Sequence, residues 1–336
     1  MILYLLIYLF IIFFLNNLFF KKEFLGSSTG LIHQLFVNKS VPLTGGIFMV
    51  LPVIYLFIDY YSLMILTYLL FFCLGLLSDL DILSSSKKRF FIQLVTILIF
   101  ILITKLQVFP TRINFIDIYF QNSYVSYFFS IFCFLVLING SNFIDGLNGL
   151  LLGYILMIFF YLFKLNLIEF INIDYIKFLY FILIITFLLF LNFRNKLFLG
   201  DSGAYSLSFL LGFILIKIYN NNLQISPYFI IVLLWYPCFE NLFSIIRKIF
   251  HKSNPLKPDN KHLHQYLFLH LKSKLDLKNT TINNLSSLII NFFNFLIFYF
   301  ATQNIYNTNL QLMLLLISVA IYLISYKILN NKLKSF

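Results

Sequence analysis

Glycine, asparagine and aspartate gather in a few short segments of a chain that is otherwise strongly apolar. The segment "NGSNFIDGLNGL" covers residues 139–150, and "FLGDSGAY" covers residues 198–205. Asp201 precedes small residues and a new apolar run, so it lies where the free amides of a helix N-terminus can meet an anion. A carboxylate there repels an anion unless a cation lies between them. Asp201 is therefore a candidate magnesium ligand with diphosphate oxygens completing the shell, or else a simple helix cap.

The segment 139–150 repeats this combination of residue types. Asn142 and Asp145 are three residues apart, so on a helix they share one face, which Asn148 extends. An amide can give its oxygen to a metal ion or hydrogen-bond a base or sugar. Asn142 is therefore the second candidate metal ligand. The alternative is a polar helix break that neighbouring helices satisfy.

Carboxylates also occur in "LLSDLDILSSSKKRFFIQ", residues 76–93, at the end of an apolar run. Asp79 lies next to the run, where it can bind a metal ion or accept a proton from a phosphate; a solvated loop is the alternative. For Asp81, and for the basic residues 87–89, we favour the solvated loop.

Basic and histidine side chains gather in "KPDNKHLHQ", residues 257–265. Histidines two apart with no nearby cysteine fit a helical zinc site poorly. Donors for a phosphate or a leaving nucleotide are the better interpretation of Lys261, His262 and His264, against an ordinary solvated loop. Lys196 is a further candidate substrate contact.

Two more features concern packing around such a site. Gly203, like other glycines near Asp201, lets backbone approach a ligand closely, and we assign it to substrate binding. Glu240 lies in an apolar run, where a carboxylate normally faces a partner inside the bundle. We expect it to support the site, with Arg247 as a candidate neighbour.

The composition of the whole chain indicates whether the protein lies in water or in a membrane. Hydrophobic residues make up 61% of the 336 residues and charged residues only 11%, against about 25% in a soluble domain. The sequence therefore predicts an all-α polytopic membrane protein, a single domain over residues 1–336. Its cysteines lie in apolar runs at unrelated spacings, which favours neither a disulfide framework nor a metal site.

Apolar runs close to the length of a bilayer crossing predict about eleven transmembrane helices, with ten also compatible. They are 1–20, 43–60, 62–78, 90–108, 124–140, 148–165, 175–192, 203–219, 226–246, 284–301 and 309–327. With the N-terminus outside and the C-terminus in the cytoplasm, all but five of the 24 Lys and Arg residues fall on the cytoplasmic side, as the positive-inside rule requires. The five outside are Lys105, Arg112, Lys164, Lys177 and Lys217.

The same orientation places every polar segment on the cytoplasmic face. The active-site loops are then expected at about 21–42, 78–89, 139–149, 192–203 and 247–283. No comparable cluster falls on the outer face, which favours one site at the inner membrane surface. A formal net charge of +12 suits an anionic nucleotide and an anionic lipid head, and equally the inner leaflet.

In this order the motifs resemble the polyprenyl-phosphate N-acetylhexosamine-1-phosphate transferases of glycosyl transferase family 4. "VPLTGG" is similar to the family's P-x-x-GG turn, "SDLDILSSSKKRFFIQ" to its DDxxD segment and "NGSNFIDGLNGL" to NxxNxxDGxDGL. "FLGDSG" is similar to F-x-GD-x-G and "PDNKHLHQ" to PD-x-x-H-x-H. Members transfer a sugar 1-phosphate from a UDP-sugar to polyprenyl phosphate and release UMP, starting a lipid-linked surface glycan.

The resemblance implies roles for individual residues. Asn142 and Asp201 would hold Mg²⁺, with Mn²⁺ as an alternative, and Asn148 would contact the uracil. Asp79 and Asp145 would line the phosphate site as catalytic residues. The diphosphate would be neutralised by Lys261 and by the catalytic histidines His262 and His264.

Two departures from the family pattern matter. Ser78 stands where many members have the first Asp of DDxxD, so that carboxylate cannot act as a base. Asn148 stands where bacterial members often have Asp, and its amide can still pair with a uracil edge. "HLHQ" lacks the histidine run of the branch that uses phospho-MurNAc-pentapeptide, which favours an amino-sugar donor.

The expected partners are therefore a UDP-N-acetylhexosamine, polyprenyl phosphate and the lipid bilayer of a bacterial inner membrane, without nucleic acid and with an oligomer left open. The rival class is a secondary transporter or lipid flippase. Transporters tend to place their sites near the bilayer midplane on repeated halves. The polar clusters of this chain lie at one face, and its halves do not match.

Overall fold

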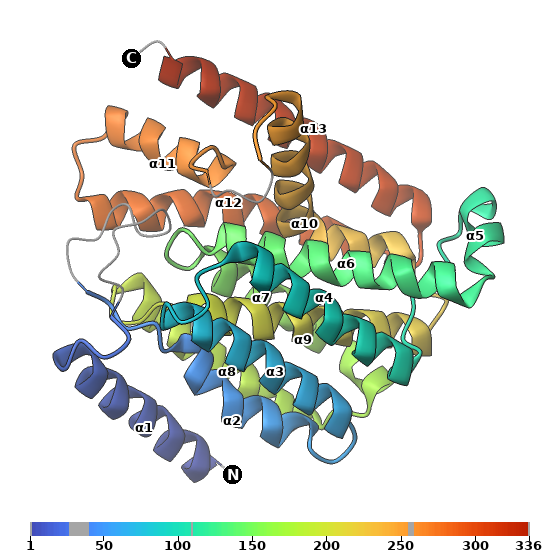
Figure 1. The fold of residues 1–336 in the computed structure, drawn as a ribbon, viewed down its shortest axis with the longest axis horizontal. Coiled ribbons are helices and arrows are strands. Elements are labelled where there is room, and N and C mark those ends of the chain that lie inside the picture. Colours follow the sequence, from blue (N-terminus) through green and yellow to red (C-terminus); the bar gives the residue numbers. More distant parts are fainter. Residues whose placement is uncertain (1, 27–39, 109, 255–258, 335–336) are drawn as a thin grey trace.

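The computed structural model describes residues 2–26, 40–108, 110–254 and 259–334, and in them the chain is almost entirely helical (Figure 1). The helices are α1 (Ile2–Lys21), α2 (Gly45–Phe57), α3 (Ser62–Asp79), α4 (Ser86–Thr104), α5 (Asn114–Phe120), α6 (Ser123–Ile144), α7 (Leu150–Lys164), α8 (Tyr175–Phe193), α9 (Gly200–Asn221), α10 (Pro227–Phe250), α11 (Leu263–Lys274), α12 (Asn279–Ala301) and α13 (Thr308–Lys334). A 3₁₀ turn covers Leu167–Ile171. The described residues contain no strand, only two isolated bridges. The all-α prediction is confirmed.

Each of the eleven predicted spans corresponds to a helix of this bundle. Eight described helices are long and apolar enough to cross a membrane: α1, α3, α6, α8, α9, α10, α12 and α13. The other three differ for identifiable reasons. The helices α2 and α7 are apolar but only 13 and 15 residues long, and α4 has three consecutive basic residues directly after its first residue, Ser86.

The predicted loops contain two helices that the apolar pattern did not reveal. The short helix α5 lies between α4 and α6, and α11 lies in the polar segment after α10. The predicted loops at 21–42 and 247–283 also include residues 27–39 and 255–258, which lie outside the described residues.

The centre of the bundle is α9, whose spanning segment is 94% buried. Its closest neighbour is α3, which approaches at Gly75. A Cβ atom on Gly75 would lie only 2.4 Å from the backbone of Asp201 and Ser202. Glycine is therefore required at this position, because it lets the end of α3 touch the start of α9. The carboxylates at these two helix ends are brought together as a result.

Proline inside α10 is accommodated by a neighbouring helix. Pro237 has no N–H and so leaves the carbonyl of Leu233 without its helical partner. The hydroxyl of Tyr154, on α7, donates to that carbonyl at 2.9 Å. Such compensation is expected in a bilayer, where water cannot satisfy a backbone oxygen. The helix therefore continues beyond Pro237 and carries Glu240 and Arg247 to the polar end.

The two chain ends lie toward opposite ends of the bundle (Figure 1). The helix α13 runs toward the end that holds α11, whereas α1 begins toward the end that holds α5. An odd number of crossings would produce this arrangement. Which end faces the cytoplasm stays a prediction.

Candidate active site

Three aspartates from three helices form an acidic cluster at the polar end of the bundle: Asp79, Asp145 and Asp201. Asp79 is the last residue of α3, and its two oxygens accept hydrogen bonds from the backbone N–H groups of Asp201 (2.8 Å) and Ser202 (3.0 Å). Asp79 thus acts as an external cap for the first turn of α9. It fixes where Asp201 can lie.

The turn before α9 depends on glycine. Gly200 has a φ of +76°, in the left-handed region that other residues rarely adopt. A Cβ atom there would also lie 2.7 Å from Oδ2 of Asp79. Conformation and space both exclude a side chain at this position.

Asp201 is the most connected carboxylate of the cluster. Its Oδ1 accepts a hydrogen bond from Nδ2 of Asn142 at 2.6 Å. Its Oδ2 accepts from the hydroxyl of Ser78 at 2.6 Å and lies 2.6 Å from NH1 of Arg89. The predicted metal ligands Asn142 and Asp201 are therefore in direct contact, although they are 59 residues apart in sequence.

Asp145 caps the C-terminus of α6, just beyond the membrane-spanning segment. Burial, followed by the nearby charges of Asp201 and Asp79, raises the pKa of Asp145 well above its ordinary value. Within the described residues its carboxylate has no hydrogen bond or ion pair. The cluster therefore contains three carboxyl groups, of which only Asp201 forms an ion pair within the described residues.

The donor set fits a divalent cation that is shared with substrate. No group of three or more His, Cys, Asp or Glu side chains in the described ranges is arranged to hold a metal ion unaided. Magnesium usually takes one or two carboxylates and completes its shell with water and substrate phosphate. One Asp201 oxygen, the adjacent Asn142 amide and the nearby Asp145 carboxyl group suit that pattern.

Arg89 and Ser78 belong to this cluster, and the sequence interpretation missed them. Arg89 had been assigned to the solvated loop with its basic neighbours. A short connection between α3 and α4 brings the first turn of α4 back against the end of α3, with Asp81 exposed in the turn at a φ of +58°. The small number of residues between the two apolar runs was the available signal.

The histidines lie on a helix and not in the predicted loop. His262 is the N-cap of α11, and His264 lies in its first turn. Both rings are buried, and they stack at an interplanar angle of 11° with centroids 5.6 Å apart. His264 lies against the loop after α6, because a Cβ on Gly146 would meet its Nε2 at 2.8 Å. The structure thus brings His264 next to the residue that follows Asp145.

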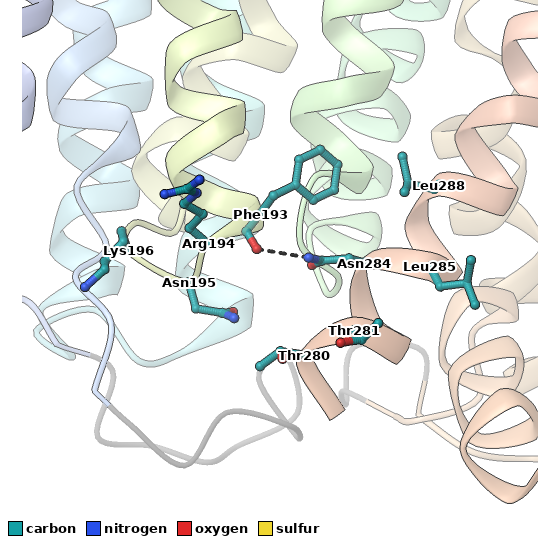
Figure 2. A pocket seen from close by; sticks show the side chains of 9 residues that line it. All are labelled: Phe193, Arg194, Asn195, Lys196, Thr280, Thr281, Asn284, Leu285 and Leu288. Atoms are coloured by element: carbon teal, nitrogen blue, oxygen red, sulfur yellow. Dashed lines mark hydrogen bonds between the residues drawn. The ribbon is translucent and has the colours of Figure 1, made fainter. Parts of the chain in front are cut away.

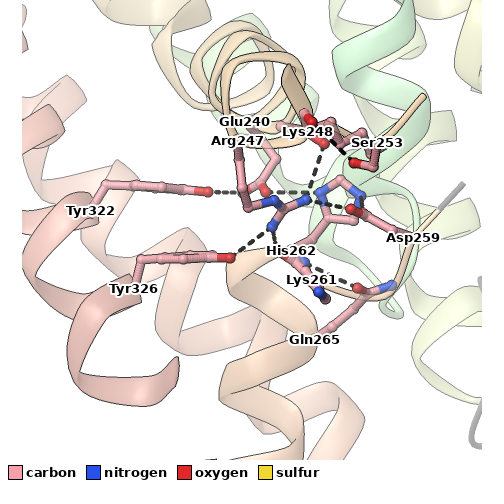
Figure 3. Close-up of polar contacts among 11 residues, drawn as sticks. Glu240, Arg247, Lys248, Ser253, Asp259, Lys261, His262, Gln265, Tyr322 and Tyr326 are labelled. Atoms are coloured by element: carbon pink, nitrogen blue, oxygen red, sulfur yellow. Dashed lines mark hydrogen bonds and ion pairs between the residues drawn. The ribbon is translucent and has the colours of Figure 1, made fainter. Parts of the chain in front are cut away.

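Glu240 is fully buried, as expected, but its partner is not Arg247 (Figure 3). Oε1 lies 2.9 Å from Nδ1 of His262, and Oε2 accepts from the hydroxyl of Tyr322 at 2.8 Å. Arg247 instead pairs with Asp259 at 2.7 Å. Arg247 thus lies near Glu240, as expected, but it does not pair with it, because His262 occupies the position beside the carboxylate.

Asn148 lies at the edge of a separate pocket of about 510 Å³ between the end of α8 and the start of α12. Its Nδ2 donates to the side-chain oxygens of Asn195 (2.7 Å) and Asn284 (3.1 Å), both of which line the pocket (Figure 2). Asn148 itself is only 3% exposed. A ligand in this pocket would therefore meet a cluster of amides.

The remaining predicted residues differ in their surroundings. Lys196 lines the same pocket, and its ammonium lies 4.5 Å from the ring centroid of Phe20. The side chain of Lys261 is exposed. Gly203 is buried where α9 crosses α2, and a Cβ there would lie 2.3 Å from Leu199 and 3.1 Å from Gly46. Close helix packing explains this glycine, so its substrate contact stays a prediction.

Comparison with known proteins agrees with this architecture. Residues 61–219 match the model of glycosyl transferase family 4. The chain is 28% identical over 194 residues to the undecaprenyl-phosphate alpha-N-acetylglucosaminyl 1-phosphate transferase of Thermotoga maritima, which covers 57% of each chain. It is also 28% identical over 196 residues to the probable undecaprenyl-phosphate N-acetylglucosaminyl 1-phosphate transferase of Bacillus subtilis, covering 58% of this chain and 54% of that protein. The match thus spans a little over half the length of these relatives.

The fold and the site define a polytopic membrane protein with an acidic, amide-rich centre at one end of its helices. Residues 61–219 are similar to glycosyl transferase family 4, and the two relatives match over a little more than half of the chain. The matched segment contains all three aspartates of the cluster together with Asn142, Asn148 and Arg89.

Proposed function

We propose that the chain transfers an N-acetylhexosamine 1-phosphate, of the N-acetylglucosamine type, from a UDP-sugar to polyprenyl phosphate and releases UMP. One observation carries this proposal: Asn142 and Asp201 touch within an acidic cluster of a chain that is similar to glycosyl transferase family 4. The printed names of both relatives describe undecaprenyl-phosphate N-acetylglucosaminyl 1-phosphate transfer.

Asn142 and Asp201 would hold the magnesium ion, which when bound supplies positive charge to the diphosphate. The chain supplies further positive charge through Arg89, whose NH1 lies at Asp201. Asp79 holds the turn that presents Asp201 and so acts by positioning. Asp145 lies beside Asp79 and Asp201, and we propose that it lines the phosphate site.

In the proposed reaction, an oxygen of the acceptor phosphate forms a bond to the β-phosphorus of the UDP-sugar. The bond from that phosphorus to the bridging oxygen breaks, and its electron pair leaves with UMP. A phosphate monoester has a second pKa near 6 and is already largely dianionic at neutral pH. The chain therefore needs no strong general base, which is consistent with Ser78 at the first position of the DDxxD-like segment.

The donor nucleotide is proposed to reach the amide cluster around Asn148, where the uracil edge can exchange hydrogen bonds with amides. Lys196 and Lys261, being exposed cations near this end of the bundle, would attract the diphosphate. His264, buried beside Gly146, would face the charge on the departing nucleotide.

We further propose that the reaction takes place at the cytoplasmic surface of a bacterial inner membrane, with the N-terminus outside and the product starting a surface glycan. Purified protein, UDP-[³²P]GlcNAc, polyprenyl phosphate and Mg²⁺ test the proposal directly. Labelled lipid product and released UMP are expected. If no UDP-N-acetylhexosamine gives labelled lipid or UMP, the transferase proposal is wrong and a transporter or flippase becomes the better interpretation. A screen of UDP-GlcNAc, UDP-GalNAc, UDP-FucNAc and UDP-QuiNAc then identifies the donor.

A further inference from the structure

A hydroxyl group on the last membrane-spanning helix reaches the site through a buried carboxylate. Tyr322, on α13, is only 2% exposed, and its OH donates to Oε2 of Glu240 at 2.8 Å. Glu240, on α10, is completely buried, so it depends entirely on protein donors. Removing the hydroxyl of Tyr322 would leave one of its oxygens without a partner.

Glu240 holds His262 by a hydrogen bond, and a second carboxylate lies close to the same ring. Nδ1 of His262 lies 2.9 Å from Glu240 Oε1. Its Nε2 lies 3.3 Å from Asp259 Oδ1, which accepts no hydrogen bond within the described residues. Glu240 is therefore the carboxylate that positions the His262 ring.

The fixed ring of His262 in turn sets the plane of His264. The two rings are nearly parallel, with an interplanar angle of 11°. Phe143, on α6, packs against His262 at 5.3 Å. His264 is held between this stack and Gly146, which follows Asp145. A change at Glu240 is therefore transmitted by contact to the edge of the acidic cluster.

A parallel connection holds the same segment from the other side (Figure 3). Arg247 pairs with Asp259 at 2.7 Å, donates to the carbonyl of Lys261, and donates to the hydroxyl of Tyr326 at 2.7 Å. Tyr326 lies one turn after Tyr322 on α13, and their rings are nearly parallel. Two tyrosines of α13 thus contact Glu240 and Arg247 on α10, and these two residues contact His262 and Asp259.

We propose that Tyr322 is a positioning residue of the site: by fixing Glu240 it fixes His262, and through the ring stack it orients His264 against the loop that carries Asp145. The proposal rests on the transferase function proposed above. It assigns to α13, outside the family-matched segment, a role in turnover and not only in crossing the membrane.

The test is Tyr322→Phe, which removes one oxygen and retains the ring. The expected result is an about tenfold fall in kcat, the effect of losing one hydrogen bond to a charged group, with KM for the UDP-sugar little changed. Tyr61→Phe is the matched control: its hydroxyl donates a single hydrogen bond, to the carbonyl of Ile171 at 3.0 Å, near the opposite end of the bundle. Equal kcat in the two variants would overturn the proposal.

A double-mutant cycle separates positioning from general loss of stability. If Tyr322 acts through Glu240, adding Tyr322→Phe to Glu240→Gln lowers kcat no further, because the connection is already broken. Tyr61→Phe should change kcat by the same factor in the Glu240→Gln protein as in the wild-type protein. If Tyr322→Phe also lowers kcat by the same factor in both backgrounds, Tyr322 acts independently of Glu240 and the proposal is overturned.

A measurement that does not depend on enzyme activity distinguishes a failure of the Tyr322 proposal from a failure of the proposed transferase function. In protein labelled with ¹⁵N-histidine, the ring resonances of His262 and His264 should move in Tyr322→Phe and stay in place in Tyr61→Phe. Unmoved resonances would overturn the positioning role even in an active transferase. Absence of product from the wild-type protein would instead remove the transferase function, while the resonances still decide whether the contact chain exists.

Discussion

Two groups of acidic side chains lie at the same end of the molecule, and they differ in how many carboxyl groups have a protein partner. In the network around Glu240 and Asp259, Arg247 pairs with Asp259, and Nδ1 of His262 lies 2.9 Å from Glu240. In the acidic cluster, Arg89 is the only cation from the described residues that forms an ion pair with any of the three aspartates. Both carboxylates of the first group thus have a basic partner, whereas only one of the three in the second group does.

This difference indicates that the two groups of charges have different roles. Buried charges without partners are unfavourable, so a protein retains them where something else completes them. The network around Glu240 and Asp259 holds chain segments in place, as its links between α10, α11 and α13 indicate. The acidic cluster is suited to a cation and a phosphate that arrive from outside. The predictions below change each group in turn.

The largest effect is expected from Asp201→Asn, which removes the charge at the centre of the cluster. Turnover should fall by at least about a hundredfold, the scale seen when an electrostatic contact to a transition state is lost. The folded yield should remain, because asparagine can keep the contacts to Asn142 and Ser78. Lipid-linked product is the measurement. Asp117→Asn is the control and should retain turnover. Asp117 lies in α5, where its Oδ1 accepts hydrogen bonds from the backbone N–H and the hydroxyl of Thr111.

In the network around Glu240 and Asp259, Glu240→Gln should lower stability as well as kcat. It removes the charged acceptor of the hydrogen bonds with His262 and Tyr322, and a hydrogen bond to a charged group typically contributes about 2 kcal/mol of unfolding free energy. A clear fall in the melting temperature of the detergent-solubilised protein is the measurement. An unchanged melting temperature would mean that the Glu240–His262 contact contributes nothing to the fold.

Arg89→Gln tests the single cation of the acidic cluster. We expect about a tenfold loss of turnover, because the partly exposed pair with Asp201 contributes less than the central carboxylate. Lys88→Gln, on the same first turn of α4 but fully on its exposed side, is the control. Equal activity in both variants would return Arg89 to the role of an ordinary surface cation.

The smallest and most specific effect is expected for Asp145→Asn in metal-free buffer. Because folding raises the pKa of Asp145, its contribution to stability is present below the unfolded pKa and is lost as pH rises through the folded value. The variant should therefore melt higher than wild type at alkaline pH and show a weaker dependence on pH. Parallel melting curves for the two proteins across pH would contradict this.

Much of the architecture could be predicted because the bilayer imposes it. Runs of apolar residues specify helices, and all eleven predicted runs are helices in the structure. The helices α5 and α11 were not predicted, because with 7 and 12 residues they are too short to appear as membrane-crossing apolar runs. The burial of His262 and His264 was not predicted, because it depends on the packing of α11.

The acidic cluster was predictable in part. Asp79, Asp145 and Asp201 occur at the ends of apolar runs, which is where a site at the membrane surface needs them. The partners of Glu240 could not be predicted, because Tyr322 is 82 residues away and sits in an apolar run like many other tyrosines. The hydrophobic pattern of a sequence does not show which hydroxyl group donates to a buried carboxylate.

Gly200 has a consequence for engineering this protein. With its left-handed backbone and the Asp79 carboxylate 2.7 Å from where a β-carbon would sit, even alanine would displace the oxygens that cap α9. A mutant library that searches for new donor sugars should therefore hold this codon constant and vary the amides around Asn148. Variants at position 200 would be unable to bring Asp79 and Asp201 into the observed arrangement.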